Sequence, residues 1–509
     1  MNQHLTFLPV LLPMLAGVIL LVSPFGKTKQ NRRITSVVLS SITFLVSLAL
    51  LMKVQADGTQ VYAIGDWSAP FGIVLVADPL STLLVCLTTL LGFVCALYAS
   101  AGDDEKGSFF HPLVHFLILG VNGAFLTGDA FNLFVFFEVL LIASYSLLMH
   151  GGDKKNTRAA LHYVILNLVG SAIFLIGLGV LYGVLGTLNM ADMAQQVAHL
   201  QGDDVYLAKI GGLLLLVVFA LKGALLPLHL WLPNTYATAM PVVAALFAIM
   251  TKVGVYSMMR VYTLIFGDEV GELSHMAQSW MWWFALATIA MGAVGVLASK
   301  DLRKLTANLV VVSVGTLVAL VAVQTIEASA AAIYYLVHST LVTAALFILA
   351  DLIGRQRGDV ADRITAGPTI LQPRLLGVCF LIAGIAVIGM PPLSGFIGKV
   401  WLLKATLDAE YTFVFWPLYL LASLAILFGV AKAGSTVFWH HKSNAQSKVT
   451  ETVEQTRVHP MQLAALIILV SCAPLMSIFA GPLSEYAIGA ATQLHDFNSN
   501  INVILSGGK

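Results

Sequence analysis

Charged residues are scarce in this sequence. They make up 10% of the 509 residues, whereas 58% of the residues are hydrophobic and the mean hydropathy is +0.88. A soluble domain carries about 25% charged residues, so this chain cannot cover a folded surface with solvated side chains, and lipid must be its solvent. Neither sign of charge dominates, since 27 Lys and Arg residues stand against 26 Asp and Glu residues. The composition therefore excludes a soluble enzyme and argues against a nucleic-acid-binding surface.

Motifs for metal, redox or nucleotide chemistry are also missing. The four cysteines lie singly in apolar stretches with no C-x-x-C pair, at Cys86, Cys95, Cys379 and Cys472. This pattern predicts small core residues rather than a disulfide framework, an iron–sulfur cluster or a zinc site. No Walker A loop, dinucleotide fingerprint or haem-ligating histidine pair stands in a suitable context. We therefore expect no metal site and no cofactor, and no nucleotide or redox chemistry within this chain.

Apolar runs of transmembrane length are abundant. A membrane-spanning helix needs roughly 20 mostly apolar residues. About fourteen runs meet this requirement, near 5–24, 34–52, 79–99, 111–127, 130–149, 159–185, 207–228, 236–265, 279–298, 305–324, 330–353, 375–407, 411–438 and 460–480. The first run lacks a basic n-region and an A-x-A cleavage site, which indicates a retained span rather than a signal peptide.

The basic residues predict the topology. With the N-terminus outside, 18 of the 27 Lys and Arg residues fall in inner loops, three fall in outer segments and six fall within or at the ends of spans. This asymmetry is what the positive-inside rule requires. We expect a multi-pass protein of a bacterial inner membrane with both termini outside, and a tail after residue 480 that is a surface helix or disordered.

Four charges fall inside apolar runs where their side chains cannot reach the membrane surface: Glu138, Lys222, Lys252 and Lys399. Each costs about 2.5–3.5 kcal/mol at the bilayer centre, so an unpaired set would cost roughly 10–14 kcal/mol. They must therefore face a wet or paired protein interior. A purely structural ion pair between Glu138 and Lys222 would leave the other two lysines unexplained, so we favour a proton or ion path.

Two of these lysines lie close to prolines that interrupt their spans. Lys222 precedes Pro227 in K-G-A-L-L-P-L-H-L-W-L-P, and Lys399 follows Pro392 in G-M-P-P-L-S-G-F-I-G-K. Proline breaks or kinks a helix, and such breaks in corresponding positions of two halves indicate an inverted-repeat transporter. We predict five-span units over 111–265 and 279–438, each with its fourth helix broken. A three-helix segment over 1–110 precedes them, and an inner loop, last span and outer tail over 439–509 follow.

Other ionisable residues lie within the spans or at their ends. His229 lies in the first broken region and His338 lies mid-span, where each is either a packing residue or a proton relay. Asp78 and Asp129 stand at span starts, where we expect helix caps. Arg260 and Lys404 lie near span ends, where long side chains can reach the membrane surface.

Several motifs resemble a known family. The runs G-D-A-F-N-L-F-V-F-F-E-V-L-L-I-A-S-Y-S-L-L, K-G-A-L-L-P-L-H-L-W-L-P, L-F-A-I-M-T-K-V-G-V-Y and D-L-R-K-L-T-A-N resemble the antiporter-like subunits shared by Mrp-type cation/proton antiporters and respiratory complex I. The resemblance covers roughly residues 75–440. It implies an all-α integral membrane protein with about 14 transmembrane helices, two inverted five-helix repeats and broken helices 7 and 12.

The resemblance also implies a polar axis for proton transfer. Glu138 matches the family's glutamate of span five, Lys222 the lysine of broken helix seven and Lys252 the central lysine of span eight. His338 matches the histidine of span eleven, and Lys399 matches the terminal ionisable group of helix twelve. At about 4 Å and an effective dielectric near 20, Glu138 and Lys222 would attract each other by about 4 kcal/mol. Separation of this pair would then send the proton towards Lys252 and onwards.

Two departures from the family pattern narrow the resemblance. The axis ends in Lys399 where the complex I subunit of most similar pattern usually has glutamate, and Ser313 stands where many relatives carry a histidine in span ten. The lysine ending, the F-F-E-V-L-L-I-A-S-Y run and the chain length are most similar to the D-type subunits of Mrp antiporters. His229, Ser313 and Lys404 are possible accessory residues.

The resemblance implies a secondary transporter subunit rather than an enzyme. In this interpretation the chain moves H⁺ in exchange for Na⁺ or another monovalent cation, beside a larger A-type subunit and small membrane subunits, and supports pH homeostasis. A proton-pumping membrane subunit of a respiratory dehydrogenase or membrane hydrogenase is the alternative with the same fold. A third possibility is a structural membrane subunit whose charges only hold helices together.

Overall fold

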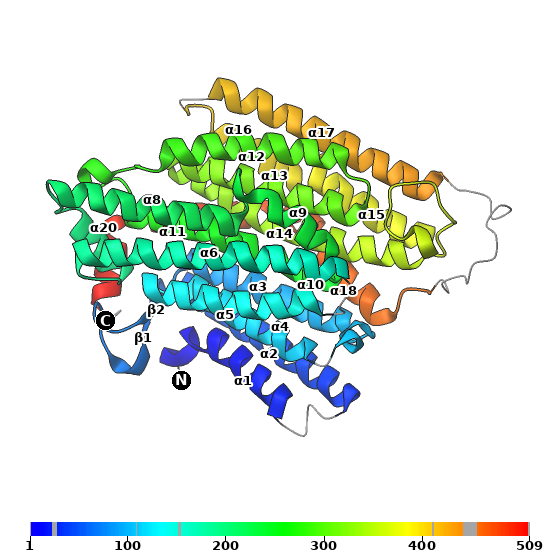
Figure 1. The fold of residues 1–509 in the computed structure, drawn as a ribbon, viewed down its shortest axis with the longest axis horizontal. Helices are drawn as coiled ribbons and strands as arrows, with labels where there is room; N and C mark the ends of the chain where they lie inside the picture. The colour runs from blue at the N-terminus through cyan, green and yellow to red at the C-terminus, as the bar shows by residue number, and fades with distance from the viewer. Residues whose placement is uncertain are drawn as a thin grey trace.

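Helices account for most of the chain, and they run side by side along the long axis of the molecule (Figure 1). The computed structural model describes residues 2–22, 28–107, 109–150, 154–409, 412–440 and 456–506. The α-helices are α1 Leu8–Val22, α2 Lys29–Asp57, α3 Pro79–Ala99, α4 Phe110–Leu126, α5 Ala130–Met149, α6 Lys154–Leu185, α7 Met190–Val197, α8 Asp203–Gly223, α9 Trp231–Thr238, α10 Pro241–Phe247, α11 Met250–Leu264, α12 Gln278–Ala298, α13 Leu302–Val323, α14 Ile326–Arg355, α15 Pro373–Ile388, α16 Ser394–Ala405, α17 Thr412–Trp439, α18 Pro460–Ile478, α19 Ala480–His495 and α20 Phe497–Leu505. Short 3-10 turns include η4 Asp103–Lys106 and η5 Leu228–Leu230.

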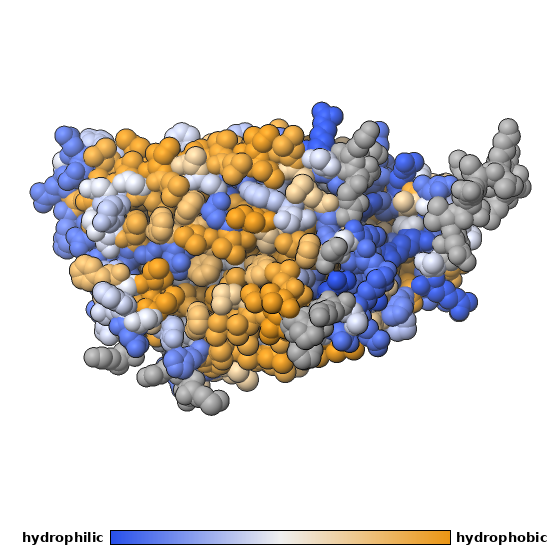
Figure 2. Space-filling model, turned by 60° about the horizontal axis from the view of Figure 1, so that its bottom comes forward, coloured by the Kyte–Doolittle hydropathy of each residue, from blue (hydrophilic) through white to orange (hydrophobic). Residues whose placement is uncertain are grey.

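The predicted spans correspond to helices of the structure. Among the described residues, eleven helical segments are long and apolar enough to cross a membrane, and the shorter apolar helices α1, α4 and α15 bring the number to fourteen. The fold predicted from the sequence is confirmed, whereas the residue boundaries of its four segments remain a prediction. Figure 2 shows the consequence at the surface, where a broad apolar band separates two more polar ends.

Two spans are interrupted where the sequence predicts breaks. Helix α8 ends at Gly223, and Ala224 then adopts a left-handed conformation with φ 58° before α9 begins at Trp231. Helix α15 ends at Ile388, and the left-handed Gly389, with φ 80°, leads towards α16. Each interrupted span is the fourth of five in its predicted unit. A left-handed residue ends a helix because its backbone turns away from the helix axis.

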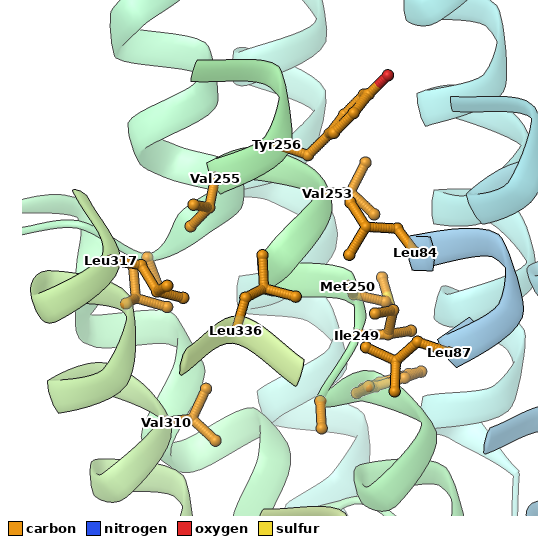
Figure 3. Close-up of a cluster of buried hydrophobic side chains, with 14 of the residues drawn as sticks. Leu84, Leu87, Ile249, Met250, Val253, Val255, Tyr256, Val310, Leu317 and Leu336 are labelled. Carbon is orange, nitrogen blue, oxygen red and sulfur yellow. The ribbon is translucent and has the colours of Figure 1, made fainter. Parts of the chain in front are cut away.

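The most buried helices lie in the middle of the bundle. The apolar window of the α10–α11 span is 100% buried, and those of α13 and α14 are 94% and 89% buried, against 28% for α2. Figure 3 shows side chains from α3, α11, α13 and α14 packed together there, including Leu84, Val253, Leu317 and Leu336. Ionisable groups on these central helices are therefore enclosed by protein rather than by lipid.

The two ends of the bundle contain different structures, ion pairs at one end and a β-hairpin at the other. At the end that carries η4, Asp103 pairs with Arg355 and Asp104 pairs with Arg33; this end, which holds most of the predicted inner loops, is called the basic end below. At the opposite end, strands β1 Gln60–Ala63 and β2 Val74–Ala77 form an antiparallel hairpin. Helix α20 also lies at this end, on the same side of Figure 1 as β1 and β2.

The structure tests two predictions, one for the C-terminal tail and one for Arg260. The tail after residue 480 is not disordered up to residue 506, because α19 packs on α14 and α20 packs on α7. Arg260 does not reach the membrane surface, so that expectation is wrong. Its guanidinium forms a buried ion pair with Asp78, the residue that also caps α3 as predicted. The pair joins the start of α3 to α11.

Candidate functional site

A polar bridge on α6 lies between Glu138 and Lys222. Ser171 of α6 donates a hydrogen bond to the Glu138 carboxylate of α5. One turn earlier on α6, the Asn167 amide oxygen accepts a 2.9 Å hydrogen bond from the Lys222 ammonium of α8. Residues four apart on a helix share one face, so a single face of α6 contacts both ionisable groups. Lys222 is only 5% exposed, whereas Glu138 is half-buried.

The expected direct contact between Glu138 and Lys222 is absent. Both side chains are described, and no ion pair within 4.0 Å joins them. The attraction of about 4 kcal/mol worked out for a 4 Å pair is therefore too large for this arrangement, because Coulomb energy falls with distance. The Lys222 ammonium also lies 5.7 Å from the centre of the Phe137 ring, within cation–π range. In this state the two groups are coupled through α6.

Lys252 occupies the centre of the bundle. It is 1% exposed, and its ammonium donates a 2.8 Å hydrogen bond to Ser313 of α13. Helix α11, which carries Lys252, crosses α8 closely at two glycines. A Cβ on Gly254 would lie 2.6 Å from the backbone nitrogen of Gly223. This contact fixes the backbone next to Lys222 against the backbone next to Lys252.

His338 and Lys399 meet at the second broken span. The His338 ring on α14 hydrogen-bonds through Nδ1 to the Ser394 hydroxyl at the start of α16, at 2.8 Å. On α16, the Lys399 ammonium donates to the Ile388 carbonyl at 2.7 Å and to the Ser423 hydroxyl of α17 at 2.9 Å. His338 is 2% exposed and Lys399 is 9% exposed. The structure thus brings these two predicted site residues to the same half-helix.

The interruptions create favourable surroundings for ammonium groups. Lys222 stands in the last turn of α8, and Lys399 reaches back to Ile388, the last residue of α15. The last carbonyls of a helix have no partner within the helix and carry partial negative charge. Gly389 makes the second approach possible, because a Cβ there would lie 2.4 Å from Cδ of Lys399. Both lysines therefore lie at the C-terminal end of a half-helix.

The three accessory candidates differ in their positions and contacts. Ser313 belongs to the site through its hydrogen bond from Lys252. His229 is 8% exposed, and its Nδ1 has no hydrogen-bond partner among the described residues. Lys404 pairs with Glu327 at 3.0 Å, with side chains that are 68% and 48% exposed, at the end opposite the basic end. Its pair borders a cavity of about 360 Å³ that Trp282 and Asp408 also line.

Sequence reasoning missed the neutral partners of the charges. They are Asn167, Ser171, Ser394, Ser423 and the ring of Tyr419, which lies 5.5 Å from the Lys399 ammonium. Two of them left a signal, because Asn167 and Ser171 stand four residues apart inside an apolar span. Asp129 has the predicted structural role, since its side chain accepts a hydrogen bond from the Asn132 amide and caps α5. Burial raises the pKa of Asp129.

Comparisons with known proteins place this geometry in context. Residues 127–429 match the family model described as NADH:quinone oxidoreductase/Mrp antiporter, TM. The chain is 37% identical to a D-type subunit of a probable K(+)/H(+) antiporter from Rhizobium meliloti, over 97% of this chain and 96% of that protein. It is also 37% identical to the D-type subunit of the Na(+)/H(+) antiporter from Bacillus subtilis, over 99% of both chains. Its fold is similar to a chain in the structure of the Mrp complex from Dietzia sp. DQ12-45-1b, with a TM-score of 0.87, 26% identity and 99% coverage of both chains.

Proposed function

The chain belongs to the NADH:quinone oxidoreductase/Mrp antiporter membrane family, and from this premise we propose that it moves protons along the Glu138–Lys399 axis in exchange for Na⁺. It is a D-type subunit of a multisubunit cation/proton antiporter, a transporter subunit rather than an enzyme. Its assignment to a bacterial inner membrane with both termini outside is part of this proposal, as is a larger A-type partner beside small membrane subunits.

The observation that carries the proposal is the enclosure of three lysines in one bundle. Lys222, Lys252 and Lys399 are 5%, 1% and 9% exposed, and each donates to an oxygen of a neighbouring helix or half-helix. Burying three ammonium groups is expensive, and hydroxyl or amide oxygens offset only part of that cost because they carry no full negative charge. Such groups exchange protons readily, and a purely structural role would be served better by apolar side chains.

The proposed proton route follows the contacts from α5 to α17. When Glu138 is charged, its field favours the ammonium form of Lys222 across the Asn167–Ser171 face of α6. When Glu138 is neutralised, Lys222 loses this support and releases its proton towards Lys252. From Lys252 the route continues along Ser313 and His338 to Lys399, with mobile water between groups that do not touch. The uptake of a cation in the complex drives the change at Glu138.

Cation-induced collapse of a pH gradient in inverted vesicles tests the proposal. A host without its own antiporters expresses the complete gene cluster, with Glu138→Ala, Lys222→Ala or Lys399→Ala in this chain. We expect each variant to assemble and to lose exchange, because each removes one proton carrier. Lys209→Ala, at an exposed lysine of the same helix as Lys222, is the matched control and keeps exchange. Normal exchange by an assembled Lys222→Ala complex would contradict the proposed axis.

The same vesicles distinguish the two family functions. The family description also covers NADH:quinone oxidoreductase, so a proton-pumping subunit of a respiratory complex is the second candidate. Collapse of the gradient on addition of Na⁺ supports the antiporter, and a larger response to K⁺ would change the cation. Proton pumping that follows electron donors, with no response to either cation, supports the respiratory function.

A further inference from the structure

A second cluster of titratable groups lies outside the lysine axis, between α2, α4 and η4. His111 and His115 stand one turn apart on α4 and are 0% and 1% exposed. The Ser36 hydroxyl of α2 contacts both rings, at 2.9 Å from Nδ1 of His111 and 3.2 Å from Nε2 of His115. Because a hydroxyl has one proton to donate, at least one of the two rings must donate to Ser36.

The cluster connects to the basic end of the bundle through Asp104. Nε2 of His111 lies 3.4 Å from the Asp104 carboxylate, which is fully buried. Arg33 binds the same carboxylate at 2.6 Å, and the neighbouring Glu105 is 43% exposed at the surface. His111, Ser36 and His115 are therefore joined by hydrogen bonds, with the Asp104 carboxylate next to the outer ring, and the four groups lead from this end into the apolar band.

The inner end of the cluster is a narrow buried crevice that Pro13 and Ile118 also line. His115 lines it together with Ser40, Thr43 and Thr89. Nδ1 of His115 and the hydroxyl of Ser40 are buried there without a hydrogen-bond partner among the described residues. An unpaired buried polar atom is costly, so this nitrogen is an observation independent of the contacts at Ser36. It leaves His115 with a ring position that no described partner occupies and at which a proton can bind.

We propose that Asp104, His111, Ser36 and His115 form a proton-binding relay that is separate from the lysine axis and opens to the basic end of the bundle. For release, a proton leaves Nε2 of His115 for the Ser36 oxygen as the Ser36 proton moves to Nδ1 of His111. Nε2 of His111 then gives its proton to Asp104. Uptake follows the same steps in reverse, so every proton gained by one group is lost by its neighbour.

The charged and titratable described groups around the two rings are few. The Asp104 carboxylate lies beside His111, and Arg32 and Arg33 of α2 approach that carboxylate to 4.0 Å and 2.6 Å. His150, at the end of α5, also lies near the cluster, with its ring 5.6 Å from that of Phe110.

Helix α4 gives the relay a route to Glu138. A Cβ on Gly120 would lie 2.6 Å from the backbone nitrogen of Leu140, and one on Gly123 would lie 2.2 Å from the Phe136 ring. Both contacted residues are on α5, two positions from Glu138. A change in the charge of α4 therefore acts at short range on the helix that carries Glu138. We infer that the relay sets the pH range in which exchange occurs, which rests on the proposed function.

The proton occupancy can be measured without transport. The complete complex is labelled with ¹⁵N-histidine, and the ring nitrogen shifts are followed from about pH 5 to about pH 9. We expect signals that are missing from the His111→Gln/His115→Gln variant to titrate, and Ser36→Ala to separate their two titrations. His199→Gln, at an exposed histidine, leaves these signals unchanged. Signals that keep one shift over the whole range would overturn the relay, whatever the result for exchange.

Transport tests the coupling to Glu138. A unit charge on a neighbouring helix, roughly 10 Å away, shifts a titration by about one unit at an effective dielectric near 20. We therefore expect the pH midpoint of exchange to move by about one unit in the assembled His111→Gln/His115→Gln complex and not in the His199→Gln complex. An unchanged midpoint beside clear histidine titration would overturn the coupling.

Discussion

Replacement of Asn167 by alanine tests the bridge between Glu138 and Lys222. The Asn167 amide oxygen is the hydrogen-bond acceptor of the Lys222 ammonium, at 2.9 Å in a site that is 5% exposed. A hydrogen bond to a charged group contributes about 1.5–3 kcal/mol. Its loss reduces the ratio of protonated to neutral Lys222 by about tenfold to about 150-fold at a given pH.

The expected consequence is a displaced pH profile of cation/proton exchange. If Lys222 must hold its proton for part of each cycle, the alkaline limb of the profile moves towards lower pH by about one to two units. The measurement is the initial rate of cation-induced gradient collapse across a pH series, in vesicles matched for the amount of assembled complex. Exchange persists at acidic pH, which distinguishes this variant from Lys222→Ala.

Two further variants make the result specific to the acceptor oxygen. Asn167→Asp keeps an oxygen at the same position and adds a negative charge that favours the ammonium form, so the alkaline limb moves towards higher pH rather than lower pH. Leu168→Ala changes the next residue of α6, a 55% exposed side chain, and leaves the whole profile unchanged. If Asn167→Ala exchanges with the wild-type profile, the α6 bridge has no part in proton transfer and the reasoning from this contact is refuted.

Three further predictions concern packing and charge. Gly254→Ala should lower exchange and reduce the free energy of unfolding by about 1–3 kcal/mol or more, because the added Cβ would lie 2.6 Å from the backbone nitrogen of Gly223. A Cβ on Gly223 would lie no closer than 3.7 Å to any atom of a neighbouring helix, so Gly223→Ala is the control and should be tolerated. Arg260→Leu should lower the free energy of unfolding by about 3–5 kcal/mol, because it leaves Asp78 buried and unpaired. In a thermal melt in detergent, the double variant Asp78→Asn/Arg260→Leu should recover part of this loss. Strictly additive losses in the two single variants would contradict the pairing. Burial raises the pKa of Asp104, but His111 and Arg33 outweigh this effect and hold the pKa at about 2. The stability that the ionised Asp104 carboxylate contributes is therefore complete above about pH 4 and is lost as the pH falls through 2. Asp104→Asn should remove this acid sensitivity of the melting temperature.

The spans, the breaks and the buried charges could be predicted because each is written locally in the chain. An apolar run of about 20 residues has one stable environment, and Pro227 and Pro392 cannot continue a helical hydrogen-bond ladder. A lysine such as Lys252 in the middle of a run has no path to the membrane surface. These constraints act within one segment, so no knowledge of tertiary contacts is needed to recognise them.

The partners of the charges could not be predicted because they come from distant segments. Lys222 and Asn167 are 55 positions apart, Lys252 and Ser313 are 61 apart, and Arg260 and Asp78 are 182 apart. Which helix faces meet depends on the packing of the whole bundle. The sequence therefore favoured a direct Glu138–Lys222 pair, since opposite charges are the obvious partners, whereas neutral side chains on α6 lie between them.

The three lysines differ in how well their backbone surroundings support a positive charge. Lys222 and Lys399 lie at the C-terminal ends of α8 and α15, where unpaired carbonyls favour cations. Lys252 is the third residue of α11, away from any helix C-terminus, and Ser313 is its one side-chain acceptor in the described chain. In the proposed route, a proton on Lys222 or Lys399 has the last carbonyls of a half-helix beside it, whereas a proton on Lys252 does not. Lys252 would then be a position through which the proton passes, and transfer to it would depend on the charge state of Glu138, which acts on Lys222 across α6.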